Sequence, residues 1–306
     1  MYDFILSQEK NYPVKVMCGL FSVSRSCYYV YRKSGDKPQN DLEKAIEAQV
    51  VAAFTAHKRR YGVRRLVPEL ADQGLKIGKY KVQEILHKFG LQAIQPKSFV
   101  PRTTDSRHPY PISPNLLEEK PLPVRIDQVW VGDITYIPLK GGGWGFLAVW
   151  MDLFSRKVTG WQLLNNMKEG LIIEAFNKSW ANRKPGKGLI IHSDRGGQYA
   201  GTIFRKLLTG YELLQSMSGA DNPYDNAFME SYFSRFKAEL LEGGAFESLE
   251  DARTEIFEYI EMYYNPVRRH SSLAISARSL LSKKWVTNKK RRIDKKKKRS
   301  KKRKTC

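Results

Sequence analysis

The chain has 306 residues, 42% of them hydrophobic and 12% aromatic, which suffices for a sizeable core and argues against disorder over most of its length. Its formal net charge of +22 points to a polyanionic partner. The three cysteines form neither a disulfide framework nor a CxxC zinc pair, so a reducing cytoplasm is the expected compartment.

The basic charge is shared between the body of the chain and its C-terminal end. Residues 289–306 contain thirteen Lys or Arg and one Asp, so this segment carries +12 and the remainder carries +10. The N-terminus lacks the basic start and long apolar core of a signal peptide, and the apolar run at 146–151 is far too short for a bilayer. We therefore expect no membrane association.

Residues 1–40 are predicted to form an N-terminal helical segment. Two short apolar patterns lie on either side of Ser24-Arg25-Ser26, within residues 12–34. They fit a small helix-turn-helix or, equally well, a helical hairpin that packs on the next domain. The segment ends in linker-like residues at 33–40.

Residues 41–94 are predicted to be all-helical and to form a helix-turn-helix-like DNA-binding region. An apolar stripe runs from Leu42 to Phe54, a second helix starts near Arg64, and a third carries Val82 and Leu86 after a turn between two glycines. Basic side chains beside the turns are candidates for phosphate contacts, with an ordinary solvated basic face as the alternative. These candidates are Arg64, Arg65, Lys79 and Lys81.

Seven prolines within residues 95–127 predict an extended linker, after which the pattern changes. Strands are expected at 128–139, 144–153, 157–164, 189–193 and 211–216, and helices at 171–180, 202–209, 226–241 and 249–264. The resulting order β-β-β-α-β-α-β-α predicts a mixed five-stranded sheet with helices on its faces. This core is expected to span 128–282 and to be followed by a basic, disordered tail at 283–306.

Three acids in this core suggest a chemistry. Asp133 lies within the first strand, Asp194 follows the fourth strand, and Glu230 lies on the helix that follows an Asp225-Asn226 cap, with 35 residues between the last two acids. Each alone is more often a turn, cap or surface residue. Three carboxylates that meet in one cleft need a cation between them, and hard oxygen ligands favour Mg²⁺ or Mn²⁺.

Five motifs give the chain a resemblance to a known family. They are WVGDITYI at 130–137, DLFSRKVTGW at 152–161, HSDRGGQY at 192–199, DNPYDNAFMESYFSRFKAEL at 221–240 and YNPVRRHSSL at 264–273. With them the chain resembles the DDE-type insertion-sequence transposases, specifically the second-reading-frame product of two-frame elements, in the retroviral-integrase core superfamily. Two departures are the absence of a Cys/His zinc module before the core and Ser276-Ala277-Arg278 where the family usually has a proline.

The resemblance implies a ribonuclease-H-like fold and a transposase that cleaves and transfers DNA strands at the ends of an insertion sequence. It implies that Asp133, Asp194 and Glu230 are the catalytic residues that hold two Mg²⁺ (or Mn²⁺). It also implies that Lys237 contacts the element's end, against the alternative that Lys237 pairs with Glu230. His192 matches the family motif, either as a buried core histidine or as a neighbour of the catalytic residues. Asn226 also matches the motif but has no assigned role. Arg269 and His270 are expected to have a structural role.

The expected partners are DNA, at the terminal inverted repeats and at the target, a second copy of the chain for the two ends, and an upstream-frame product as fusion or partner. A cytoplasmic, nucleoid-associated bacterial protein is expected. A DNA-binding regulator with an inert core and a hydrolytic nuclease remain as alternatives. A tyrosine recombinase is disfavoured, because no matching downstream Arg and Tyr follow Arg268-Arg269-His270.

Overall fold

The structure is a computed structural model that describes residues 1–35, 41–96, 108–118, 122–219, 227–242, 244–270 and 276–277. It divides into two compact units, Met1–Ala93 and Ile94–Cys306. The predicted cap at Asp225-Asn226 and the predicted basic tail lie outside the described residues. No helix in the described part of the chain combines the length and the hydropathy that a membrane crossing needs.

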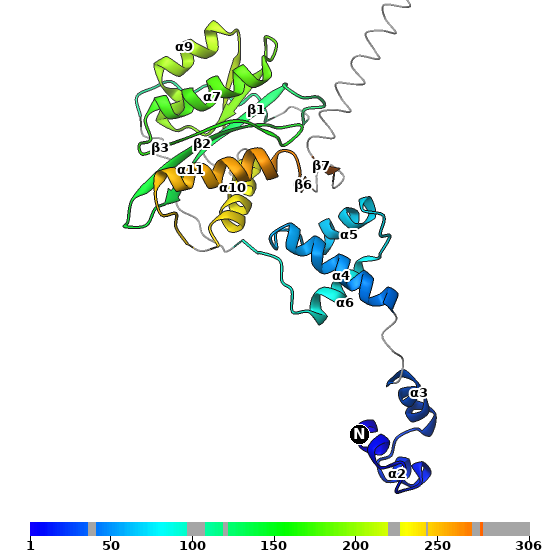
Figure 1. Ribbon diagram of the computed structural model, residues 1–306. Helices are drawn as coiled ribbons and strands as arrows, with labels where there is room; N and C mark the ends of the chain where they lie inside the picture. Colours follow the sequence, from blue (N-terminus) through cyan, green and yellow to red (C-terminus); the bar gives the residue numbers. More distant parts are fainter. Residues whose placement is uncertain are drawn as a thin grey trace, which may run out of the picture. The chain divides into compact units, whose positions relative to one another are not determined.

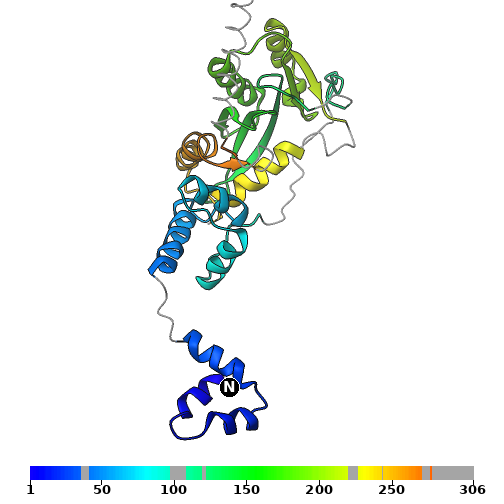
Figure 2. The same cartoon turned by 90° about the vertical axis from the view of Figure 1, so that its right-hand side faces the viewer.

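The first unit begins with a small three-helix module (Figures 1 and 2). It consists of α1 (Tyr2–Gln8), α2 (Val14–Leu20) and α3 (Arg25–Gly35). Their buried side chains form one hydrophobic cluster of Ile5, Met17, Cys18 and Tyr28. This module therefore has a core of its own, and α1 was not predicted from the apolar pattern.

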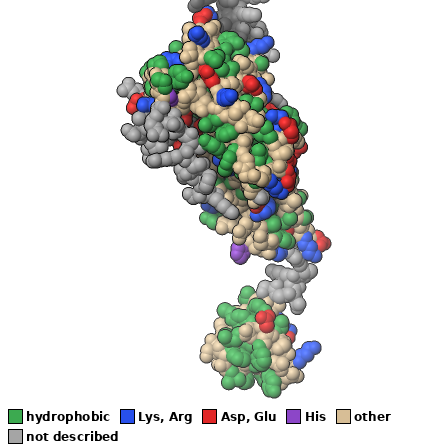
Figure 3. Space-filling model, turned by 90° about the vertical axis from the view of Figure 1, so that its left-hand side faces the viewer, with side chains coloured by type: hydrophobic (Ala, Val, Ile, Leu, Met, Phe, Trp, Pro, Cys, Tyr) green, Lys and Arg blue, Asp and Glu red, His purple; other side chains and the backbone are tan. Residues whose placement is uncertain are grey.

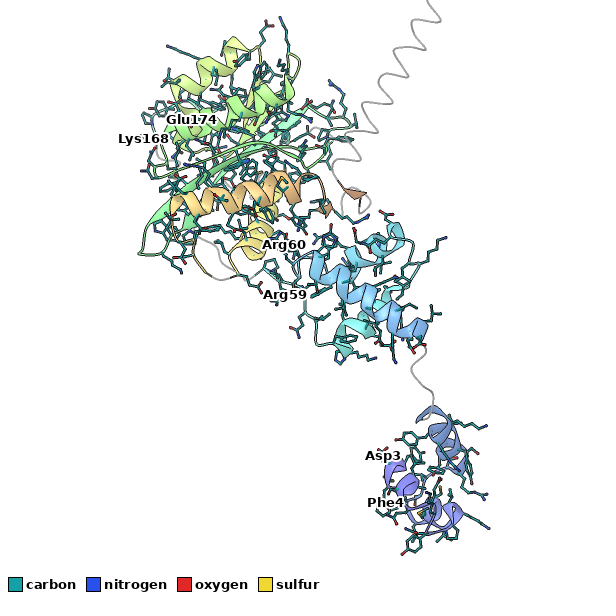
Figure 4. All side chains as sticks on the ribbon, in the orientation of Figure 1. Asp3, Phe4, Arg59, Arg60, Lys168 and Glu174 are labelled. Atoms are coloured by element: carbon teal, nitrogen blue, oxygen red, sulfur yellow. The ribbon has the colours of Figure 1, made fainter. Side chains whose placement is uncertain are left out.

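The rest of the first unit is the predicted helix-turn-helix-like region. It comprises α4 (Asp41–Ala56), α5 (Val63–Asp72) and α6 (Lys79–Lys88), with apolar side chains of all three helices buried. Gly74 has a φ of 92°, so a glycine suits the turn between α5 and α6. Arg59 and Arg60 follow the end of α4 (Figure 4).

The second unit is built on one mixed sheet. Its strands are β1 (Val129–Pro138), β2 (Trp144–Asp152), β3 (Val158–Leu164), β4 (Ile190–Ser193) and β5 (Leu214–Met217), in the order β3-β2-β1-β4-β5. The first three strands pair antiparallel, whereas β4 pairs parallel with both β1 and β5. The predicted mixed five-stranded sheet is confirmed.

Helices cover both faces of this sheet (Figure 1). The helices α7 (Glu169–Arg183), α8 (Gly197–Ala200) and α9 (Thr202–Gly210) contribute to one hydrophobic core. The helices α10 (Ala227–Leu240) and α11 (Leu249–Phe257) contribute to the other core, and α11 continues into the π-helical segment Glu258–Tyr264. Side chains of β1 alternate between the two cores, as a strand covered on both faces requires. The short strands β6 (Arg269–His270) and β7 (Ser276–Ala277) form a separate pair.

The YNPVRRH motif at 264–270 packs on the α10 face of the sheet through buried polar contacts. The Asn265 side chain exchanges two 3.0 Å hydrogen bonds with the backbone of Val158 on β3. Arg268 forms a fully buried ion pair with Glu239 of α10, whose carboxylate also accepts a 2.9 Å bond from the Tyr259 hydroxyl. The motif thus connects α10, the π-helical segment and the sheet, which gives this part of the motif a structural role.

The described part of the proline-rich segment runs along the β5 side of the sheet. The hydroxyl of Ser113 donates to Gln215, and the backbone N–H of Leu116 donates to the Ser216 hydroxyl at 2.9 Å. The backbone N–H of Met217 also donates to the carbonyl of Pro114. Residues 108–118 are therefore attached to the strand beside β4.

Candidate active site

Asp133 lies within β1, and Asp194 directly follows β4, the parallel neighbour of β1. In the β1–β4 ladder Val131 is opposite His192. Asp133 follows Val131 by two residues within β1, and Asp194 follows His192 by two residues, directly after the end of β4. Paired parallel strands are about 4.8 Å apart, so this register indicates that the two acids lie near each other just beyond the paired residues. Val131 belongs to the core on the α10 face, and the alternation of side chains along β1 directs Asp133 to that same face.

Electrostatics supports this proximity. Burial raises the pKa of the Tyr199 phenol well above its usual value, and the charges of Asp133 and Asp194 raise it further. Both carboxylates therefore act on one buried hydroxyl. Asp133 accepts a 2.8 Å hydrogen bond from the N–H of Ile134, and Asp194 accepts one of 3.0 Å from the N–H of Gly196. These local bonds orient the two carboxylates.

Glu230 lies in the first turn of α10 and its side chain is exposed. The opposite side of this helix is anchored by the buried residues Met229, Tyr232, Phe233 and Phe236, which belong to the core that also contains Val131. Among the described residues, no group of three or more His, Cys, Asp or Glu is arranged to hold a metal ion. The structure thus brings two of the three predicted acids together and leaves Glu230 on the surface of α10.

Lys237 lies two turns after Glu230 on the same side of α10, about 10 Å further along the helix. Burial lowers the pKa of the Lys237 ammonium group, and the negative charge of Asp133 partly offsets this effect. Glu230 makes no such contribution. Lys237 is therefore close to Asp133, rather than paired with Glu230.

The four predicted DNA contacts in the first unit have different surroundings. Arg64 and Lys79 are exposed, and the Lys79 ammonium group lies 4.7 Å from the centre of the Tyr80 ring. Arg65 donates to the carbonyl of Arg60 at 3.4 Å. Lys81 binds both Glu84 and Glu43 at 3.0 Å, and these two hydrogen bonds raise its pKa. Its charge is already balanced by two carboxylates.

His192 is fully buried, and its Nδ1 lies 2.8 Å from the Ser216 hydroxyl. This environment is that of a core histidine, one of the two interpretations left open by the sequence. Arg269 and His270 form β6, whereas Asn226 lies outside the described residues.

Two buried polar residues of the core were missed by sequence reasoning. Asp152 is fully buried and accepts hydrogen bonds from Ser155 and from the backbone N–H of Asp127, which orders the turn after β2. Burial raises the pKa of Asp152, although these bonds lower it. Tyr199 is the other, and its position within HSDRGGQY is the only signal the sequence offers.

Family comparisons match both units. The integrase core domain family matches residues 123–223, and a second integrase core domain family matches 211–276. The HTH-like domain family matches 41–99. The matches therefore cover the sheet, α10 and the helices α4 to α6.

Individual relatives extend over most of the chain. It is 37% identical over 272 residues to the transposase InsF for insertion sequence IS3A of Escherichia coli (strain K12), covering 88% of this chain and 94% of the relative. It is also 37% identical over 259 residues to the insertion element IS600 uncharacterized 31 kDa protein of Shigella sonnei, covering 84% and 94%.

A solved structure of the HTLV-2 integrase catalytic core domain in complex with magnesium is 18% identical. Its TM-score is 0.40, with 51% of this chain and 97% of that chain covered, so it adds nothing to the assignment. The assignment rests on the sequence relatives and the family matches. The chain belongs to the IS3-type insertion-sequence transposases, and it is a DDE-type polynucleotidyl transferase of DNA transposition with an integrase catalytic core.

Proposed function

We propose that Asp133, Asp194 and Glu230 are the catalytic residues of this transposase and that they hold two Mg²⁺ (or Mn²⁺). The observation that carries the proposal is the pairing of β1 with β4, which brings Asp133 and Asp194 near each other, together with the action of both charges on Tyr199. The 35-residue spacing to Glu230 and the family membership support the third acid.

The donor set fits divalent hard cations. Asp133 and Asp194 supply carboxylate oxygens from the sheet, and Glu230 supplies another from α10, which the buried Glu239–Arg268 pair fixes against the core. When bound, such ions activate the attacking oxygen and stabilise the leaving oxygen of a phosphodiester. Glu230 must turn toward the aspartates for all three acids to act together, because it is exposed in this structure.

The chain's own residues position the DNA for two in-line displacements. Water attacks first and frees a 3′-hydroxyl at the element's end, and this hydroxyl then attacks the target strand, so no covalent protein–DNA intermediate is required. The charge of Asp133 acts on Lys237, and Lys237 is suited to binding a phosphate of the end DNA. Its charge would keep the scissile strand next to the carboxylates.

The helix-turn-helix-like region supplies further DNA contacts in this proposal. Arg64 and Lys79 are exposed and are the stronger candidates for phosphate contacts. Arg65 and Lys81 remain candidates, and Lys81 must exchange at least one of its two glutamate partners to bind DNA.

The proposal extends to the chain's parts and partners. Residues 41–94 bind DNA, 95–127 connect them to the catalytic core at 128–282, and 283–306 add salt-dependent affinity. The terminal inverted repeats and the target are the DNA partners. Two copies handle the two ends, an upstream-frame product joins as fusion or partner, and the assembly acts at the cytoplasmic nucleoid.

The test is an assay for joined strands. The inverted repeats that flank the gene supply the substrate duplex, which is incubated with the chain, Mg²⁺ and a supercoiled plasmid. We expect plasmid-joined products. Products that are cut but never joined would indicate a hydrolytic nuclease, and DNA binding with neither product would indicate a regulator with an inert core.

A further inference from the structure

The three-helix module at residues 1–35 lies outside the HTH-like and integrase matches. It has its own buried core, so it is a separate structural element rather than an extension of the matched region. The two families therefore do not account for the function of this module.

The helices α2 and α3 are joined as in a helix-turn-helix. At the end of α2 the backbone N–H of Phe21 donates to the carbonyl of Met17, and the N–H of Val23 donates to the carbonyl of Cys18, each at 3.0 Å. Between them Ser22 adopts a φ of 52°, the left-handed conformation that a sharp turn needs. The helix α3 starts at Arg25, so the turn contains only residues 21–24, the length typical of this motif.

One face of α3 is occupied by α1. The Tyr28 hydroxyl donates to Glu9 at 2.6 Å, Arg32 pairs with Glu9 at 3.2 Å, and the Tyr31 hydroxyl donates to Asp3. Asp3 and the neighbouring Phe4 are labelled on α1 in Figure 4. Asp3 and Glu9 are the two acids of residues 1–35, so both are engaged inside the module.

The opposite face of α3 is open. Ser26, Tyr29, Val30 and Lys33 follow one another at helical spacing and all are exposed, with Val30 at 68% and Tyr29 at 47%. Arg25 is exposed at the start of the helix. This face combines a hydroxyl, a phenol and an apolar contact for a thymine methyl with a cation at each end, and it carries no acid.

We propose that α3 is a second DNA-reading helix, which enters a major groove with Ser26, Tyr29 and Val30 against base edges and with Arg25 and Lys33 against phosphates. The module carries five basic residues and two internally engaged acids, so it presents net positive charge to DNA. The chain then reads DNA at two places, through α3 and through the separate region of α4 to α6.

An exposed apolar surface on the same module suggests the rival occupant, another protein. Phe4, Val16 and Leu20 are exposed, and Phe4 contacts Phe21 edge-on with 5.7 Å between ring centres. Figure 3 shows hydrophobic side chains gathered on this module. These residues belong to α1, α2 and the turn, whereas α3 presents the basic residues Arg25 and Lys33 and the hydroxyls of Ser26 and Tyr29, which favours DNA for the α3 face.

The first experiment selects duplexes from a library with 30 randomised base pairs, using the full chain with Asp194→Asn to prevent cleavage. We expect a motif with two blocks. The variant Ser26→Ala/Tyr29→Ala should lose preference in one block by about tenfold or more and keep the other. Tyr12→Ala, which removes another exposed tyrosine of the module, should leave both blocks intact. The same two-block motif from the Ser26/Tyr29 variant would overturn the proposal.

The second experiment measures the salt dependence of binding to one fixed 30-base-pair duplex. Arg25→Ala/Lys33→Ala should lower the slope of log K against log salt by about two, whereas Lys10→Ala/Lys15→Ala should not change it. An unchanged slope in the α3 variant would count against the proposal. A fall in the oligomeric mass of either α3 variant, with no change in its salt slope or in the selected motif, would also count against the proposal. The module would then be a surface that docks another protein. Circular dichroism of each variant confirms that its helix content is retained. If the Ser26/Tyr29 variant does not fold, the salt slope of the Arg25/Lys33 variant decides the question.

Discussion

Asp133 has two charged or titratable neighbours, and this makes the candidate site testable one residue at a time. Its charge adds to the rise in the pKa of Tyr199 on α8, and it partly offsets the lowering by burial of the pKa of Lys237 on α10. The strand β1 and the helices α8 and α10, which are far apart in the sequence, therefore come together near one carboxylate.

Asp133→Asn should lower the pKa of Lys237 further, because the anion that stabilises its charged form is removed. An NMR titration of the labelled lysine side chain measures this shift. Glu230→Gln is the matched control and should leave the pKa of Lys237 unchanged. A shift in the Glu230 variant and none in the Asp133 variant would mean that Lys237 pairs with Glu230 instead.

Arg268→Met should destabilise the second unit by about 3–5 kcal/mol, because it leaves the Glu239 carboxylate buried without its cation. The matched control is Arg253→Met, which removes a largely exposed pair with Glu250 and should cost at most about 1 kcal/mol. Urea unfolding followed by the fluorescence of the buried Trp130 and Trp150 measures both variants. Equal costs would show that the Glu239–Arg268 pair does not fix α10.

At the residue scale, the sequence predicted the neighbourhood of the two aspartates but not their supports. A strand pattern with Asp133 inside it and an apolar run that ends at Asp194 predicted two acids on strands. The sequence alone does not give the ladder register that aligns them. The Glu239–Arg268 pair was also missed, since a glutamate on a helix is usually solvated and its arginine lies 29 positions later.

At the element scale, the close contact between β3 and α7 is sensitive to substitution. A Cβ atom added at Gly160 would lie 2.4 Å from the Ser179 hydroxyl and 2.5 Å from the Ser179 backbone nitrogen. The helix backbone has to move away from the sheet to accommodate it. Gly170, within α7, has nothing within 4 Å of its added Cβ.

Gly160→Ala should therefore cost about 1–3 kcal/mol or more through overpacking. Gly170→Ala should be neutral or stabilise the protein by up to about 1 kcal/mol, because alanine is the better helix former. Calorimetric unfolding compares the two variants. A stable Gly160→Ala variant would show that β3 and α7 are not packed as closely as described.

Most elements of the second unit were predictable, because strands and helices have different apolar periods. The long stripe at 249–264 predicted one continuous α-helix, but the structure contains α11 followed by a π-helical segment. Apolar spacing does not distinguish these two hydrogen-bond patterns over seven residues. The helix α1 and the attachment of residues 108–118 to β5 were missed because both depend on tertiary contacts.

At the scale of the whole molecule, charge and family membership agree. Residues 1–288 carry a net charge of +10 without the tail, which suits a protein whose substrate is DNA. The match to the relatives at 37% identity covers nearly the full length of each relative. The two units share the work in the proposed function: α4 to α6 and the proposed α3 contact DNA, and the sheet with α10 performs the chemistry.

The central claim is that three acids act together on a phosphodiester. Its most direct test is single-turnover cleavage, in Mg²⁺, of a duplex that carries the element's end. Asp133→Asn, Asp194→Asn and Glu230→Gln are each compared with Glu174→Gln on α7, and gel shift measures DNA binding by every variant. We predict a loss of roughly a thousandfold or more, about 4 kcal/mol, for each of the three acids, with DNA binding retained and no loss for Glu174→Gln. Normal cleavage by Asp194→Asn would contradict the account.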